Sequence, residues 1–176
     1  ISIMSELRTN KIYPRDGLPA GASGGIVQVV HAANDAHFVV GTITPVAIVS
    51  ATITPTSASN KILIQYTAAV SYDAGTAHAN TCILKNGAKI AAADSGTGSG
   101  EQFRANKTYY DDGGATDGNT MNSLSGSFLD SPATTDSITY AVGGFSNNSN
   151  GCAFNRRLSS DSYGQVTEII LMEVSG

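Results

Sequence analysis

From Gly25 to the end of the chain, apolar and polar residues alternate with a period of two rather than 3.6. This period is typical of β-strands that bury one face. In the clearest stretch, 61–72, the apolar face comprises Ile62, Ile64, Tyr66, Ala68 and Val70, and the more polar face comprises Leu63, Gln65, Thr67, Ala69 and Ser71. Similar runs predict further strands at 25–32, 37–43, 46–54, 124–130, 137–142 and 166–174.

The sharpest local signal is the stretch CILKNGAKIAA, which is centred on Asn86 and Gly87. Asn-Gly suits a type I′ turn, because both central residues of that turn have positive φ angles. Apolar residues flank the pair on both sides. We therefore predict a tight β-hairpin at this position.

The closing run, VTEIILMEV, is apolar on both faces between Ile169 and Met172. A strand buried on both faces belongs in the centre of a sheet rather than at its edge. Clusters of turn-forming residues separate the predicted strands, at 54–60, 131–136 and 146–151. About eight to ten short strands without an amphipathic helix predict an all-β fold, namely an antiparallel β-sandwich or jelly roll.

The first 24 residues do not share this alternation. Pro14 and Pro19 exclude both a long helix and a central strand there. A segment that cannot bury itself needs contacts outside its own domain, so we predict an extended N-terminal anchoring arm at 1–24 and a single domain at 25–176. The apolar residues expected to anchor the arm are Leu7, Ile12, Tyr13 and Leu18.

Composition narrows the classes of partner. The chain has 176 residues, of which 41% are hydrophobic and only 14% are charged, with a net charge of −4. Its 10 Lys and Arg residues are scattered, so the basic stripe that nucleic acid requires is missing. No apolar run approaches the roughly 18 residues that span a membrane. The first residues lack a basic region followed by an apolar stretch, so we expect no secretory signal in them. Met4 is a candidate start, with residues 1–3 as a remnant.

Candidate chemistry is sparse. GASGG at 21–25 matches the G-x-S-x-G motif of hydrolases, whose serine needs a strand before it and a helix after it. A proline-containing coil precedes Ser23 and a predicted strand follows it, so the match favours a glycine hinge. The histidines at 31, 37 and 78 have no ligand-spaced partners. We therefore expect no enzymatic activity and no cofactor.

Cys82 and Cys152 are the only cysteines in the chain. They could form a disulfide, but two small buried thiols are favoured.

A Gly- and Asp-rich stretch occupies 94–120, with a short strand possible around 102–110. Its tyrosines could stack on a sugar, and its acids could bind Ca²⁺, although their spacing does not match a calcium loop and an unliganded loop is favoured. The candidate receptor-contact residues are Tyr109, Tyr110, Asp111, Asp112 and Asp117, and the weak calcium candidates are Asp111, Asp112, Asp117 and Asn119.

Five stretches occur in an order that resembles a known group of proteins. They are ELRTNKIYPRDGLPAGASGGIVQVV, TITPTSASNKILIQ, LKNGAKI, LDSPATTDSITYAV and TEIILMEV. They are spread from residue 6 to residue 174, so the resemblance spans nearly the whole chain, and they resemble tail-fibre-like and other virion proteins of bacteriophages. The resemblance implies a C1q/TNF-like jelly roll that assembles as a homotrimer. The Gly- and Asp-rich stretch departs from the shared pattern, so the resemblance does not indicate what is bound.

The resemblance implies a structural protein on the surface of a phage particle that is assembled in the host cytoplasm. Its expected partners are further copies of itself, other virion proteins of the tail or capsid, and a glycan or receptor on the host surface. A tail-fibre or receptor-binding role in host attachment is favoured. The alternatives are a capsid decoration or head-fibre protein that stabilises the shell and, less favoured, a lectin-like glycan-binding module.

Overall fold

The computed structural model describes residues 25–72, 78–91, 105–109, 120–147, 151–160 and 162–176. These residues form eleven β-strands and no helix. The strands are β1 (Ile26–Asn34), β2 (Phe38–Val40), β3 (Val46–Ile53), β4 (Lys61–Tyr72), β5 (Ala79–Lys85), β6 (Ala88–Ile90), β7 (Lys107–Tyr109), β8 (Asn122–Asp130), β9 (Ile138–Ser146), β10 (Cys152–Phe154) and β11 (Thr167–Val174). The predicted all-β class is therefore confirmed.

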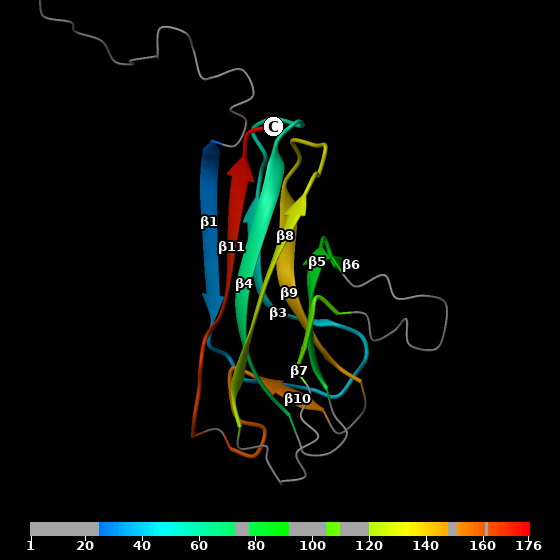
Figure 1. The fold of residues 1–176 in the computed structure, drawn as a ribbon, viewed down its shortest axis with the longest axis vertical. Coiled ribbons are helices and arrows are strands. Elements are labelled where there is room, and N and C mark those ends of the chain that lie inside the picture. Colours follow the sequence, from blue (N-terminus) through cyan, green and yellow to red (C-terminus); the bar gives the residue numbers. More distant parts are fainter. Residues whose placement is uncertain (1–24, 73–77, 92–104, 110–119, 148–150, 161) are drawn as a thin grey trace, which may run out of the picture.

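The strands pair into two antiparallel sheets (Figure 1). Sheet A has the order β1-β11-β4-β10-β2, and β8 pairs with the other side of β4. Sheet B has the order β3-β9-β5-β6, and β7 also pairs with β5. Side chains from both sheets meet in one hydrophobic core, which confirms the predicted β-sandwich.

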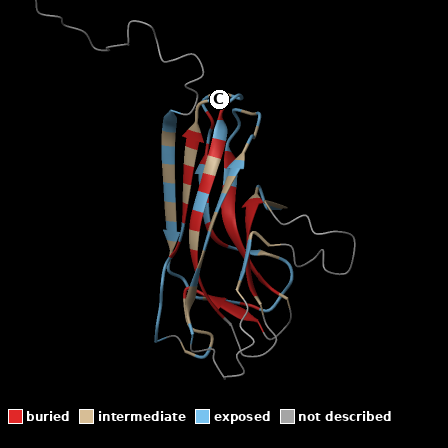
Figure 2. Ribbon diagram, in the orientation of Figure 1, coloured by how far each residue is buried: buried red, intermediate tan, exposed pale blue. Residues whose placement is uncertain are grey.

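The core is built from alternate residues of the central strands. The face of β4 that was predicted to be apolar is at most 4% exposed at each of its five residues. From sheet B, Ile83 of β5 and Tyr140 and Val142 of β9 pack against the same cluster. Figure 2 shows the opposite case in β1, where exposed and half-buried residues alternate along the border of sheet A.

Two local predictions are also confirmed. Asn86 and Gly87 have φ angles of 48° and 84°, and Lys85 pairs with Ala88 on either side of them, so the tight hairpin joins β5 to β6. The closing strand, β11, lies between β1 and β4, as its two apolar faces predict.

The sequence reading missed β10, which covers Cys152–Phe154. All three of its residues are buried, so no alternation marks it as a strand. It pairs with β4 on one side and β2 on the other, and it therefore joins β2 to sheet A. The strand predicted at 37–43 is shorter than expected, because only Phe38–Val40 finds a partner on β10.

Side-chain amides join the two sheets where β1 approaches β3. Gln28 Nε2 donates to the Thr54 carbonyl at 2.8 Å, and Asn34 Nδ2 donates to the Ile48 carbonyl at 2.6 Å. An unpaired strand border exposes main-chain groups that can pair with another chain. The two amides therefore occupy one main-chain carbonyl within β3, that of Ile48, and one just after it, that of Thr54.

Candidate assembly surface

The outer face of sheet A carries an apolar row that crosses four strands. Val29 of β1 lies opposite Met172 of β11, Met172 lies opposite Leu63 of β4, and Leu63 lies opposite Leu129 of β8. We call these four residues the apolar band. Val29 is 57% exposed and Leu129 is 49% exposed. Side chains in register on adjacent strands lie about 5 Å apart, so the band is continuous.

Exposed apolar residues extend the band toward the start of β1. Ile26 is 60% exposed and Val27 is 46% exposed. The pairing with β11 shifts between Ile26 and Gln28, which leaves Val27 in a bulge. Apolar surface of this kind on a sheet face is typical of a site that contacts another protein.

The same face becomes polar toward the other end of the strands. There a hollow of about 460 Å³ opens over β11, β4 and β8. We call it the polar hollow; its lining comprises Gln65, Tyr66, Thr67, Lys107, Ser125, Gly126, Ser127, Glu168 and Ile170. The side chains of Thr67, Ser125 and Ser127 are short, so they leave a depression between longer side chains among the other lining residues.

Gly126 lies in the floor of this hollow and has no room for a side chain. A Cβ atom there would collide with Asn106 Oδ1 and would lie 2.5 Å from the ring of Tyr66. These two groups are held in place, because the Tyr66 hydroxyl donates to Asn106 Oδ1 at 2.7 Å and lies 2.8 Å from Thr81 Oγ1. Burial raises the pKa of Tyr66 to about 12, so its hydroxyl remains protonated.

A titratable pair lies on the same outer face. His31 Nε2 and Glu168 Oε2 are 3.2 Å apart, and each side chain is about half exposed, at 52% and 49%. His31 lies opposite Ile170, in the row next to the apolar band. The pair therefore borders both the band and the polar hollow.

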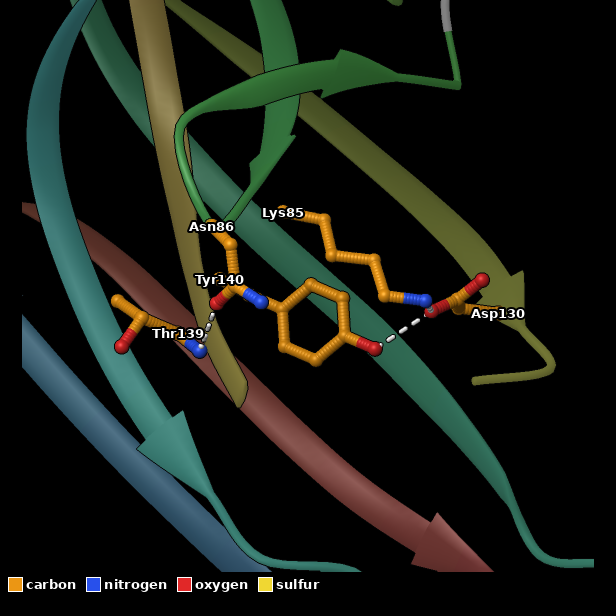
Figure 3. Close-up of polar contacts among 5 residues, drawn as sticks. All are labelled: Lys85, Asn86, Asp130, Thr139 and Tyr140. Carbon is orange, nitrogen blue, oxygen red and sulfur yellow. Dashed lines mark hydrogen bonds and ion pairs between the residues drawn. The ribbon is translucent and has the colours of Figure 1, made fainter. Parts of the chain in front are cut away.

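A second charged cluster joins the two sheets at β8, β5 and β9 (Figure 3). Lys85 Nζ lies 2.6 Å from Asp130 Oδ2, and the Tyr140 hydroxyl donates to the same oxygen at 2.6 Å. Burial and the neighbouring carboxylate raise the pKa of Tyr140 well above its usual range. Tyr140 is therefore a fixed donor rather than a proton carrier, and the cluster links the sheets.

The hairpin turn is fastened to β9 beside this cluster. Asn86 Oδ1 accepts a hydrogen bond from Thr139 N at 3.0 Å, and Asn86 N donates to the Thr139 carbonyl at 2.8 Å (Figure 3). Asn86, which has a positive φ angle in the turn, therefore continues the hydrogen bonding between β5 and β9 beyond the last paired residue of β5.

Glu173 is a fully buried carboxylate near the end of β11. Its Oε1 accepts from Thr56 N at 2.7 Å, Thr56 Oγ1 at 2.8 Å and Asn60 Nδ2 at 2.6 Å, and its Oε2 accepts from Gln28 Nε2 at 2.6 Å. Burial opposes ionisation, but the hydrogen bonds from Asn60, Gln28 and Thr56 outweigh it and lower the pKa of Glu173 to about 2. The carboxylate fastens β1 and the β3–β4 turn to β11.

Both cysteines are free and buried, as the sequence reading favoured. Burial raises the pKa of Cys82 to about 11 and that of Cys152 to about 12. Neither thiol is therefore a nucleophile at neutral pH.

Most of the predicted site residues lie outside the described residues. These are the arm residues Leu7, Ile12, Tyr13 and Leu18, the motif residue Ser23, and the loop residues Tyr110, Asp111, Asp112, Asp117 and Asn119. Tyr109 is described: it lies on β7 opposite Ala79, and its half-buried side chain packs against the core.

The apolar band was not predicted as a site. Its sequence signal was present in β11, where Ile170 and Met172 are apolar on the face opposite the core. Two apolar faces predict a central strand, but they do not by themselves predict an exposed surface. The alignment of Met172 with Val29, Leu63 and Leu129 is set by strand pairing, which the sequence alone does not show.

Among the described residues, no group of three or more His, Cys, Asp or Glu side chains is arranged to hold a metal ion. The described part of the chain also contains no helix of the length and apolarity needed to cross a membrane. No protein-family model and no curated protein matches this chain. The resemblance to phage virion proteins therefore stays a prediction.

Proposed function

We propose that this protein is a non-enzymatic structural protein of a phage virion. It assembles as a homotrimer of jelly-roll domains, is anchored by its N-terminal arm, and is displayed on the particle surface as a tail-fibre or receptor-binding type of protein. The observation that carries the self-assembly is the apolar band on sheet A; the virion role and the number three rest on the resemblance of the sequence.

The band supports self-association for a physical reason. Monomeric proteins rarely leave a contiguous apolar patch of more than a few hundred Å² on a sheet face, because water solvates it poorly. Here four apolar side chains are aligned across four strands, and the exposed Ile26 and Val27 continue them at the start of β1. Low charge suits a large buried interface as well, since only 14% of the residues are charged.

The first test is the mass of the full chain in solution. A trimer of 18.1 kDa chains has a mass of about 3 × 18.1, or about 54 kDa. Native mass spectrometry and sedimentation equilibrium should both give this value. A monomer at micromolar concentration would contradict the proposal.

A matched pair of variants tests the surface itself. Val29→Glu places a carboxylate in the band, and Val39→Glu makes the same change at a strand valine of similar exposure, 59%, outside the band. Burying an unpaired carboxylate is costly, so Val29→Glu should dissociate the oligomer while Val39→Glu leaves it intact. Equal behaviour of the two variants would show that association uses another surface.

Deletion of residues 1–24 tests the arm. The shortened protein should keep the oligomeric state of the full chain and fail to incorporate into particles. Imaging of particles that carry the full chain then distinguishes a tail location from a capsid decoration role. Normal incorporation of the shortened protein would refute the anchoring function.

A further inference from the structure

The segment between β10 and β11 lies at the end of the sandwich away from the C-terminus (Figure 1). The chain enters the domain at the C-terminal end, where Ser175 N donates to the Gly25 carbonyl at 3.0 Å. A domain held by its N-terminal side would therefore present the β10–β11 segment outward.

Asn155 fixes the start of this segment. It is fully buried and has a positive φ angle of 64°. Its Nδ2 donates to the carbonyls of Asn34 and Ala36, each at 2.9 Å, and its Oδ1 accepts from Thr167 Oγ1 at 2.6 Å. One side chain thus ties the segment to the β1–β2 turn and to β11.

Further bonds hold the middle of the segment. Leu158 N donates to Ser71 Oγ at 3.2 Å, and Arg156 forms a bridge with Gly164. The Arg156 guanidinium is used inside the segment, because its Nε donates to the Arg157 carbonyl at 2.8 Å. These bonds hold the described residues of the segment in place before any partner arrives, which reduces the entropy lost on binding.

On this support, Arg157 stacks on Tyr163. The guanidinium carbon lies 3.9 Å from the ring centroid. Tyr163 is 55% exposed, so the ring remains accessible beside the stacked cation. A guanidinium that stacks on a ring keeps its in-plane N–H donors, and a pair of these donors matches the two oxygens of a carboxylate.

We propose that the Arg157–Tyr163 platform binds a carboxylated sugar unit of a surface glycan. The carboxylate accepts the paired N–H donors of Arg157, and the apolar face of the sugar ring contacts Tyr163. Ser162 and Gln165 are exposed, lie within two residues of Tyr163 in the sequence, and carry polar groups that suit sugar hydroxyls. The inference rests on the surface-display part of the proposed function and names the class of ligand.

The charge distribution favours an acidic sugar over a polynucleotide. Arg156 is bonded within the segment, so Arg157 is the cation that the platform offers to a ligand. One guanidinium matches one carboxylate, whereas nucleic acid binding needs several cations along a backbone.

The test measures binding of the full chain to oligogalacturonate and oligoglucuronate by calorimetry. The control ligands are the same oligosaccharides with their carboxylates reduced to alcohols. We expect the acidic forms to bind at least about tenfold more tightly than the reduced forms, since a bidentate charged contact is lost. No detectable binding of either acid at about 10 mM would overturn the proposal.

Variants then locate the site. Arg157→Gln and Tyr163→Ser should each weaken binding at least about tenfold. Two control variants should leave the affinity within about twofold of wild type: Tyr163→Phe keeps the ring, and Lys61→Gln removes an exposed cation on β4. Unchanged binding in Arg157→Gln, or tighter binding of a single-stranded oligonucleotide than of the acidic sugars, would overturn the assignment.

These outcomes are separate from those of the proposed function. The oligomeric mass of each variant is measured on the same sample, and its retention shows that the domain still folds and assembles. Loss of sugar binding with an intact oligomer concerns the platform alone. A monomeric wild type that still binds the acidic sugars would contradict the assembly proposal and leave the platform supported.

Discussion

Substitution of Glu173 by glutamine tests how strongly the buried carboxylate fastens the end of the sandwich. Glutamine has nearly the same shape, but one of its two terminal atoms is a donor. If its oxygen replaces Oε1, its NH₂ faces Gln28 Nε2, which is also a donor. If the amide is reversed, the NH₂ faces two N–H donors, Thr56 N and Asn60 Nδ2.

Neighbouring groups cannot relieve this conflict. Rotating the Gln28 amide would give the new NH₂ an acceptor, but it would place the Gln28 oxygen against the Thr54 carbonyl, to which Nε2 now donates at 2.8 Å. A lost bond to a charged acceptor, and the weakening of the remaining bonds, cost about 2–4 kcal/mol. We expect Glu173→Gln to lower the free energy of unfolding by this amount at pH 7.

The effect depends on pH with a definite sign. The pKa of Glu173 is lowered to about 2, below the unfolded value of about 4.3, so the native state favours the ionised form. Its stabilisation is fully present above the unfolded pKa and is lost as the pH falls from about 5 toward about 2. The difference between wild type and variant should therefore shrink through this window, because a protonated glutamic acid resembles glutamine.

The assay is urea unfolding followed by far-ultraviolet circular dichroism, at one protein concentration and at several pH values between 7 and 2. Glu168→Gln is the matched control: it makes the same chemical change on the same strand, at a side chain that is 49% exposed. Exposed ion pairs contribute about 0–1 kcal/mol, so this control should change little. A pH-independent difference for Glu173→Gln, or a variant as stable as wild type, would refute the reasoning.

Three further predictions concern other buried contacts. Gly126→Ala should destabilise the domain by about 1–3 kcal/mol, because its Cβ would strike Asn106 and the Tyr66 ring. The control Gly25→Ala should leave stability unchanged, because its Cβ would meet only an ordinary contact at 3.7 Å. Equal melting curves for the two variants would contradict this prediction. Tyr140→Phe removes the donor to Asp130 and should lower the free energy of unfolding in urea by about 1.5–3 kcal/mol. The control Tyr163→Phe, at an exposed ring, should leave the free energy of unfolding almost unchanged. A larger loss of stability in the control than in Tyr140→Phe would show that the inter-sheet link is unimportant. Cys82 and Cys152 should react with a thiol reagent at pH 8 only after unfolding in urea, and rapid reaction of the native protein would contradict their burial and raised pKa values.

The sequence by itself determined the class of fold and the main strands. Period-two alternation set which face of β4 is buried, since a strand exposes alternate residues to the two sides. Asn86–Gly87 specified the hairpin, because few other residue pairs accept two positive φ angles. The two apolar faces of β11 placed it between other strands. Each of these signals is local, so a single stretch of chain carries all of it.

Tertiary structure decided which residues share a surface. The apolar band joins Val29, Leu63, Leu129 and Met172 only through the register of three strand pairs. The bonds around Glu173 likewise bring together the distant residues 28, 56 and 60, and the platform pairs Arg157 with Tyr163 through a segment held by Asn155. Register and loop anchoring depend on long-range pairing energies, which no short stretch of sequence contains, and the candidate surfaces therefore emerge only in the folded domain.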